Sequence, residues 1–186
     1  MKKTLLILTA ILSLIPVQTS AGNQVRNGDF SDATRFWFVL VNGGFRDTDS
    51  MAPFMRASEN GLEMIVDEIP GEKTQPAAVL LNQRVQTLQA GTEYVLRFEV
   101  RGMRNETMLA GLGKPVTYGE HRGNLSGGIP VREVALTPEW TPVEITFVYN
   151  EDDTLSLPGD ARETLLQFRV GRLSQVHLRN VSITEK

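Results

Sequence analysis

The 186-residue sequence contains no cysteine. This absence excludes disulfide bridges, thiolate zinc sites, iron–sulfur clusters and cysteine nucleophiles. An excess of basic residues is also missing, because 22 Asp and Glu oppose 19 Lys and Arg. Proteins that bind nucleic acid neutralise phosphates with clustered Lys and Arg, so the charge balance argues against such a partner. We therefore expect neither sulfur chemistry nor nucleic-acid binding.

Long hydrophobic runs are absent except at the N-terminus, where residues 5–17 are largely apolar. Lys2 and Lys3 precede this run, Pro16 interrupts it, and small residues follow up to Ala21. This pattern is typical of a removable export signal, and the run is shorter than the roughly 20 apolar residues of a membrane span. We predict a signal peptide over residues 1–21, no membrane span in the mature chain, and export to the extracellular space or the periplasm.

The mature chain, residues 22–186, has the length of one domain. Loss of Lys2 and Lys3 leaves 17 basic residues against 22 acidic ones, a formal charge of −5. About 165 residues can bury a sufficient core without disulfide support, whereas two compact domains would both be small. We expect a single domain over residues 22–186.

Alternation of apolar and polar residues is the main pattern in the mature chain. In residues 94–101, every second side chain is apolar and the side chains between them are mostly charged. Half-buried strands are predicted at residues 36–41, 62–66, 78–85, 94–101, 131–136, 143–149, 166–170, 176–178 and 181–184. Asn-Gly, Gly-Gly and Pro-Gly pairs separate many of them, and no window of helical length has an apolar stripe. We predict an all-β antiparallel sandwich with helix only as short turns; a barrel is the alternative.

Residues 111–128 depart from this pattern, with six glycines among 18 residues. They also include Tyr118, Glu120, His121 and Arg122, whose side chains stack or form hydrogen bonds. Glycine lets the backbone approach a partner closely, and loops both vary freely and carry function. A binding loop and a long solvated loop both remain open.

Motifs of catalysis are absent from the sequence. The only histidines are His121 and His177, and neither Gly-x-Ser-x-Gly nor His-Glu-x-x-His occurs. His177 alternates with apolar neighbours, so we expect it to face solvent on a strand, which makes His121 the better functional candidate. Acidic residues are too numerous to reveal the two positioned carboxylates that glycoside hydrolysis needs. We predict that the protein is not an enzyme.

Several stretches, in this order and at this spacing, resemble a known family. They are residues 24–30, which include Asn27-Gly28-Asp29-Phe30, followed by Trp37; residues 83–102, which include Ala90-Gly91-Thr92-Glu93-Tyr94; Thr137-Pro138-Glu139-Trp140; and residues 176–183, which include Asn180-Val181-Ser182. Together they resemble the carbohydrate-binding modules of families 4, 9 and 22. These are galactose-binding-like jelly rolls, usually attached to glycoside hydrolases, and the resemblance spans nearly all of the mature chain. It implies a jelly-roll sandwich that binds sugar along a concave sheet face or a loop-lined groove.

The resemblance also implies which residues contact sugar, because the family uses aromatic rings for stacking and polar side chains for hydroxyl groups. It points to Tyr118 as the stacking ring and to Glu120, His121 and Arg122 as the hydroxyl-binding side chains. Phe45 and Phe54 provide a second ring if they are exposed.

A second stacking position of the family is missing. It commonly precedes the Gly-x-x-Tyr turn, where this chain has Pro76-Ala77-Ala78. We therefore expect a short or differently shaped ligand in place of a long, flat polysaccharide. Trp37 and Trp140 are expected to pack in the core, since an indole buries a large area.

The structural calcium of the family is a further departure. The resemblance places carboxylates just after Phe30 and just before the last strand, where this chain has Ser31 and Arg179. A guanidinium repels a hard cation that prefers oxygen ligands. We therefore predict no bound metal or other cofactor, and we interpret Asp29 and Asp32 as turn residues.

These observations predict a secreted, non-catalytic module that recognises a poly- or oligosaccharide. Its further partner would be a glycoside hydrolase on a separate chain or a cell-surface component. One alternative is a cell-surface or assembly protein that uses the same sandwich for protein–protein contact. A small glycoside hydrolase is the other alternative.

Overall fold

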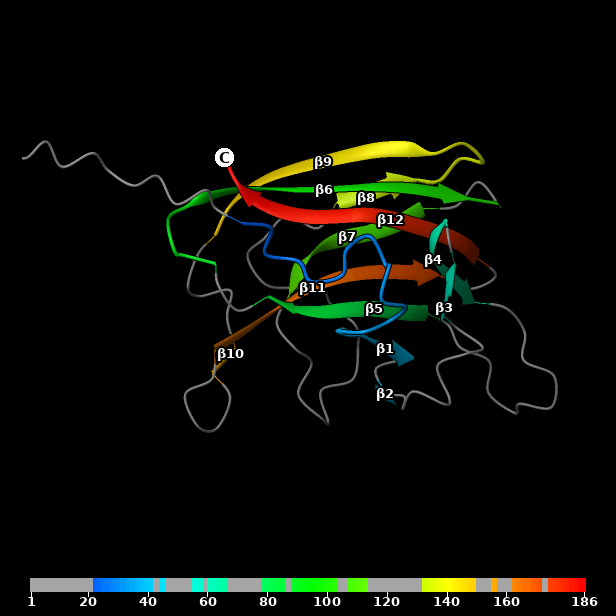
Figure 1. The fold of residues 1–186 in the computed structure, drawn as a ribbon, viewed down its shortest axis with the longest axis horizontal. Helices are drawn as coiled ribbons and strands as arrows, with labels where there is room; N and C mark the ends of the chain where they lie inside the picture. Colours follow the sequence, from blue (N-terminus) through cyan, green and yellow to red (C-terminus); the bar gives the residue numbers. More distant parts are fainter. Residues whose placement is uncertain are drawn as a thin grey trace, which may run out of the picture.

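The computed structural model describes residues 22–41, 44–45, 55–58, 60–66, 78–85, 88–103, 107–113, 132–149, 155–156, 162–171 and 174–186. The predicted signal peptide lies outside these residues. Within them the chain forms strands and no helix, so no described segment is a helix able to cross a membrane. The strands stack as two sheets (Figure 1).

The first sheet has seven strands in the order β2-β1-β5-β11-β7-β8, with β10 paired to β11. Its strands are β1 (Trp37–Val41), β2 (Gly44–Phe45), β5 (Ala78–Val85), β7 (Thr107–Gly113), β8 (Arg132–Ala135), β10 (Leu155–Ser156) and β11 (Arg162–Gly171). The second sheet has five strands in the order β3-β4-β12-β6-β9. Its strands are β3 (Met55–Ser58), β4 (Gly61–Val66), β6 (Glu93–Gly102), β9 (Thr141–Val148) and β12 (Ser174–Glu185).

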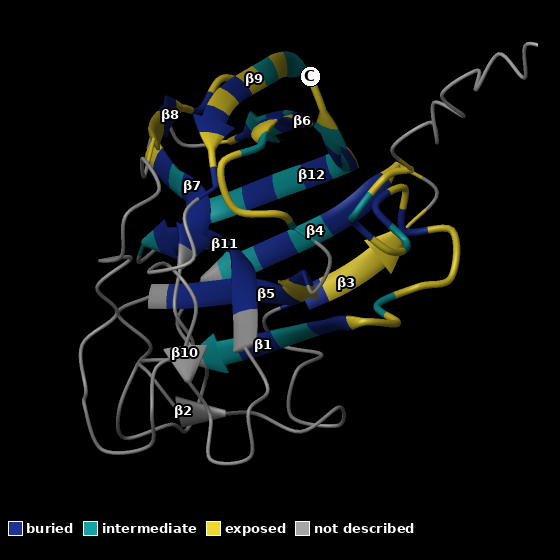
Figure 2. Cartoon of the chain, turned by 90° about the vertical axis from the view of Figure 1, so that its left-hand side faces the viewer, coloured by how far each residue is buried: buried dark blue, intermediate teal, exposed yellow. Residues whose placement is uncertain are grey.

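The predicted antiparallel sandwich is confirmed. Every pairing between the described strands is antiparallel, and the strands divide between two separate sheets, as a sandwich requires. Figure 2 shows the alternation along β9, where buried and exposed residues follow one another, whereas β5 in the middle of its sheet is almost wholly buried. The alternation along β9 shows that one of its faces is solvated, and the strand order places β9 at an edge of its sheet.

Aromatic rings from both sheets meet in the core between them. The rings of Phe98 in β6 and Phe168 in β11 lie edge to face, with centroids 5.1 Å apart. Trp37 follows at 6.2 Å from Phe168, and Phe30 at 5.3 Å from Trp37. Only 4% of the surface of Trp37 is exposed, which confirms its predicted place in the core.

The strands also depart from the predictions in three places. The stretches 176–178 and 181–184 belong to one strand, β12, whose pairing with β6 shifts register between Arg179 and Ser182. The sequence does not predict strand β7, because glycines at positions 111 and 113 are more typical of a loop. It also misses the short strands β2, β3 and β10, since two to four residues are too few to show a period.

The N-terminal segment, residues 23–28, lies along the second half of β12. The backbone N–H of Gln24 donates to the carbonyl of Ile183 at 2.9 Å, and that of Val181 donates to the carbonyl of Gly28 at 2.8 Å. A Cβ on Gly28 would lie 1.9 Å from the Val181 carbonyl oxygen, so this approach requires glycine. In Figure 1 the segment, drawn in blue, crosses from the side of β12 to that of β1.

Candidate functional site

The residues predicted from the resemblance are not placed by the described structure. Tyr118, Glu120, His121, Arg122 and Phe54 lie outside the described residues. Phe45 is described only as the backbone position opposite Leu40 in the β1–β2 hairpin. Their contact with sugar therefore stays a prediction.

Two buried carboxamides lie on the outer face of the seven-stranded sheet. Phe38, Asn82, Gln167 and Gly111 stand side by side on β1, β5, β11 and β7. The Nε2 of Gln167 donates to Oδ1 of Asn82 at 2.7 Å, and both residues are at most 1% exposed. Phe38 is half-buried and Arg84 is exposed, so this face is accessible where β1 begins and β5 ends, at one edge of the sandwich.

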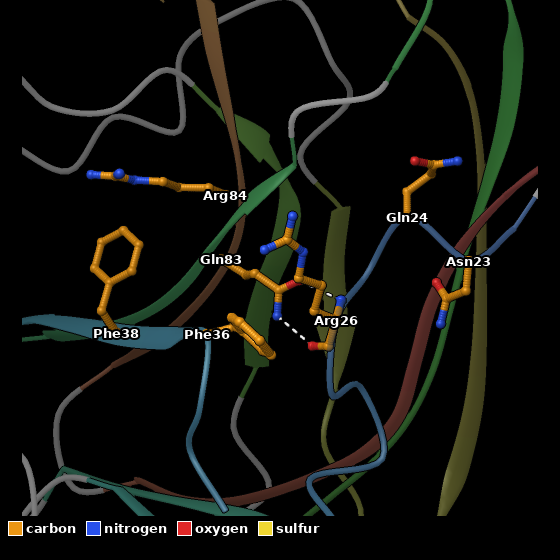
Figure 3. A pocket seen from close by; sticks show the side chains of 7 residues that line it. All are labelled: Asn23, Gln24, Arg26, Phe36, Phe38, Gln83 and Arg84. Carbon is orange, nitrogen blue, oxygen red and sulfur yellow. Dashed lines mark hydrogen bonds between the residues drawn. The ribbon is translucent and has the colours of Figure 1, made fainter. Parts of the chain in front are cut away.

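A cavity of about 460 Å³ opens at that edge (Figure 3). The described residues that line it are Asn23, Gln24, Arg26, Phe36, Phe38, Gln83 and Arg84. They come from the N-terminal segment, from the turn before β1, and from β1 and β5. Carboxamides, guanidinium groups and phenyl rings thus converge on one cavity, which we call the edge cavity.

Gln83 fixes the N-terminal segment against β5. Its Oε1 accepts the backbone N–H of Arg26 at 2.7 Å, and its Nε2 donates to the Arg26 carbonyl, also at 2.7 Å. Gln83 is only 1% exposed, so a buried carboxamide is satisfied by one backbone residue. The backbone of Arg26, and with it the base of the Arg26 side chain, is therefore held in place at the wall of the edge cavity.

Asn27 organises the turn that precedes β1. Its Oδ1 accepts the backbone N–H of Asp32 at 2.9 Å, while its Nδ2 donates to the carbonyls of Ala33 at 2.9 Å and Arg35 at 3.2 Å. Its own carbonyl accepts the indole N–H of Trp37 at 3.1 Å. Asn27 therefore does more than form a simple Asn-Gly turn, because it ties together residues 27–37.

Phe36 leaves this turn with a positive φ of 71°. A bulky residue in the left-handed region is strained, and such strain concentrates at functional sites. Its side chain is 43% exposed, and the guanidinium groups of Arg26 and Arg35 lie over its ring, at 5.3 Å and 4.9 Å from the centroid. The fold thus holds an aromatic ring partly open to solvent at the edge cavity.

Trp140 does not pack in the core, so that expectation is wrong. It lies on the outer face of the five-stranded sheet, where Arg179 is 4.0 Å and Arg101 4.9 Å from the ring centroid. Period two explains the result, because Ile145 and Phe147 point inward and a count back along β9 turns position 140 outward.

His177 lies on the same outer face, as predicted, but its side chain is only 16% exposed. Burial and the positive charge of Arg101 lower the pKa of His177, and Glu63 opposes this by raising it. His177 is therefore predominantly neutral at pH 7, and its neighbours Trp140 and Glu63 account for its position.

The residues at the family's calcium position do not suit a cation. Arg179 pairs with Glu99 at 2.7 Å, which places a guanidinium where an oxygen ligand would be needed. The hydroxyl of Ser31 donates to Asp29 at 3.0 Å, and hydrogen bonds from Ser31 lower the pKa of Asp29. Among the described residues, no group of three or more His, Asp or Glu could hold a metal ion.

Asp29 and Asp32 both act within the turn, as predicted. Asp32 forms an ion pair with Arg35 at 3.0 Å, and its backbone is held by Asn27. Each carboxylate thus has a local partner.

No protein-family profile and no curated protein matches this sequence. Solved structures do match. A family 4 carbohydrate-binding module superposes with a TM-score of 0.56 at 18% identity, over 84% of this chain and 99% of the other. A family 61 module from a complex with β-1,4-galactotriose gives 0.53 at 18% identity, over 89% and 100%. The fold is that of the carbohydrate-binding modules.

A family 22 xylan-binding domain from Paenibacillus barcinonensis supports the same fold, with a TM-score of 0.51 at 8% identity over 89% of this chain and 96% of the other. Each of these three alignments covers almost the whole of the matched chain. The jelly-roll, galactose-binding-like sandwich predicted from the sequence is thus confirmed, and the low identities limit the likeness to the fold.

Sequence reasoning does not identify the residues of the edge cavity as a site. Arg26 and Gln83 lie within the stretches that carry the family resemblance. The sequence of these stretches does not indicate that the Gln83 side chain contacts the Arg26 backbone. The two residues are 57 positions apart. Alternation assigns Phe36 to the first strand, and it gives no sign of the strained φ.

Proposed function

We propose that residues 22–186 form an exported, non-catalytic carbohydrate-binding module whose sugar binds at the edge cavity. The observation that carries this proposal is the partly exposed Phe36 ring beside carboxamides and guanidinium groups in a cavity of about 460 Å³. Binding pockets combine apolar surface with a few placed polar groups in this way. The fold supports the proposal, since the similar structures include a galactotriose complex and a xylan-binding domain.

Each part of the lining has a role in this proposal. The phenyl ring of Phe36 packs against the C–H face of a sugar ring, an interaction worth roughly 1 kcal/mol. The Oδ1 of Asn23 already accepts the backbone N–H groups of Val25 and Ile183, and the Nε2 of Gln24 donates to the Gly22 carbonyl. The Nδ2 of Asn23 and the Oε1 of Gln24 bond to hydroxyl groups of the sugar. Gln83 is already committed to Arg26, so it positions the site and does not contact the ligand.

The strained turn prepares the site before the ligand arrives. Asn27 holds residues 32–35 through several hydrogen bonds, so the direction of the Phe36 ring is set in the free protein. A preformed site avoids the entropy cost of ordering side chains on binding. One shallow site still implies modest affinity.

The absence of catalysis is also part of the proposal. Glycoside hydrolysis uses two carboxylates about 5 to 10 Å apart. The described lining of the edge cavity has no Asp or Glu. We propose that any hydrolase served by this module is a separate chain.

A glycan array tests the function directly. Protein expressed from the full sequence and purified after export should bind one class of glycan, and Phe36→Ala should weaken this binding roughly tenfold. Met103→Ala is a matched control, because Met103 is 61% exposed but directly follows β6 of the five-stranded sheet. Circular dichroism and thermal melting establish that both variants fold.

Tyr118→Ala in the same experiment separates the two sets of candidate residues. Loss of binding in Phe36→Ala alone assigns the sugar to the edge cavity, and loss in Tyr118→Ala alone assigns it to the residues predicted from the resemblance. No binding to any glycan on the array would contradict the proposed function.

A further inference from the structure

We propose that the edge cavity selects an acidic saccharide, one whose sugar rings carry carboxylate or sulfate groups. This inference rests on the proposed function and adds the chemical class of the ligand. It starts from the charge of the lining: Arg26 provides a guanidinium group, and no Asp or Glu occurs among the described lining residues.

The charge of the described lining is positive, whereas the net charge of the whole chain is negative. Acidic residues outnumber basic ones by 22 to 19 over the full sequence, and removal of the leader would increase this excess. A positive charge in the described lining of a cavity on an acidic protein attracts anions locally, and it is not a consequence of a generally basic surface. The charge is therefore a property of this cavity.

Arg26 has no carboxylate partner among the described residues, in contrast to Arg35, Arg97 and Arg179. Described ion pairs join Arg35 to Asp32, Arg97 to Glu144 and Arg179 to Glu99, at 2.7 to 3.0 Å. None of the described carboxylates lies within ion-pair distance of Arg26, whose guanidinium lies 5.3 Å from the Phe36 ring centroid. A guanidinium that meets no acid among these residues keeps its donors available for an acid on a ligand.

The position of Arg26 suits an acidic sugar in particular. Its backbone is held by Gln83, so the guanidinium has a defined origin beside the ring (Figure 3). A sugar that packs on Phe36 would bring an acidic substituent at its rim towards this guanidinium. Guanidinium binds a carboxylate or sulfate through two parallel hydrogen bonds, which gives both energy and orientation.

The test compares acidic probes with neutral counterparts of the same linkage. Isothermal titration would measure trigalacturonate against its carboxyl-reduced form, and a sulfated carrageenan oligosaccharide against its desulfated form. We expect at least one acidic probe to bind tenfold or more tightly than its counterpart. Its affinity should fall as salt rises, because screening weakens an exposed ion pair.

Arg26→Gln and Arg97→Gln form a matched pair of variants. Each removes one positive charge, but Arg97 lies on the five-stranded sheet and pairs with Glu144. Arg26→Gln should weaken binding of the preferred acidic probe roughly tenfold and that of the neutral counterpart much less, since only the acidic probe loses a hydrogen bond between charged groups. Arg97→Gln should alter neither affinity, and melting curves check that both variants fold.

The outcomes distinguish this inference from the function on which it rests. Equal affinity for acidic and neutral probes, or an equal effect of the two Arg→Gln substitutions, overturns acidic selectivity. Binding of neutral probes alone overturns it as well, while sugar binding stands. A protein that binds none of the probes and no glycan on the array overturns both.

Discussion

The carboxamide of Gln83 binds the backbone of Arg26 at both ends, with its Oε1 and Nε2 each 2.7 Å from their partners. The contact joins residues 57 positions apart. The side chain of Gln83 accepts from the N–H and donates to the carbonyl of the same residue, as the backbone of a neighbouring strand would do. It attaches the N-terminal segment to β5 and thereby forms one wall of the edge cavity. This relationship links the stability of the sandwich edge to the geometry of the proposed site.

Replacement of Gln83 by leucine should remove both bonds. The backbone N–H and carbonyl of Arg26 then lose their partners, so we expect a decrease of about 2 kcal/mol in the free energy of unfolding. Urea denaturation measures this change, with Gln89→Leu as the control because Gln89 is exposed and only its backbone is bonded. An unchanged unfolding midpoint in Gln83→Leu would show that the contact is not stabilising.

Asn27→Ala should loosen the turn that carries Phe36. The substitution removes the hydrogen bonds from the Asn27 side chain to residues 32–35. It also places alanine at a φ of 49°, a conformation that these bonds no longer support. We expect a loss of about 2 kcal/mol of stability from the missing bonds and the disfavoured backbone. Calorimetry compares it with Asn60→Ala, whose side chain is exposed, and equal melting temperatures would contradict the assigned role of Asn27.

Gly28→Ala tests the close approach of the N-terminal segment to β12. The added methyl carbon would lie 1.9 Å from the Val181 carbonyl oxygen, so the two backbones must separate. We expect destabilisation of about 3 kcal/mol, as for severe overpacking. Gly171→Ala is the matched control, because a Cβ at position 171 would meet nothing within 4 Å among the described residues. Equal unfolding midpoints for the two variants would rule out this contact.

His177 should titrate below its ordinary range. Burial and Arg101 lower its pKa from 6.5, so the folded protein binds fewer protons there than the unfolded chain. The stability that this group contributes is fully present above pH 6.5 and decreases as the pH falls below it towards the folded pKa.

NMR titration of the His177 ring measures this pKa, and His177→Asn identifies its resonances. Arg101→Gln should raise the pKa because a neighbouring positive charge is removed, whereas Glu63→Gln should lower it further. A pKa at or above 6.5 in the unaltered protein would contradict the expected direction.

Calcium should leave the thermal stability unchanged. A ligand that binds only the folded state raises the melting temperature. The guanidinium of Arg179, paired with Glu99, occupies the place of an oxygen ligand. Melting curves in millimolar calcium and in chelator should superimpose, and a reproducible rise with calcium would show that a site exists.

The sequence alone determined the class of fold and most of the longer strands. Period-two alternation reports which face of a strand is buried, and it located β1, β4, β5, β6, β8, β9, β11 and β12. The size of the indole placed Trp37 in the core correctly but misplaced Trp140. Alternation counted back from Phe147 turns Trp140 outward, so the period is a better guide there than size and apolar neighbours.

Only the tertiary structure decided where a ligand could bind among the described residues. Alternation is local, whereas the edge cavity depends on the contact of Gln83 with Arg26 and on the φ of Phe36. Neither property leaves a pattern along the chain, because each arises from residues that meet only after the sheets have formed. The sequence could thus specify a sandwich, while the position and charge of its cavity followed from how the N-terminal segment packs across its edge.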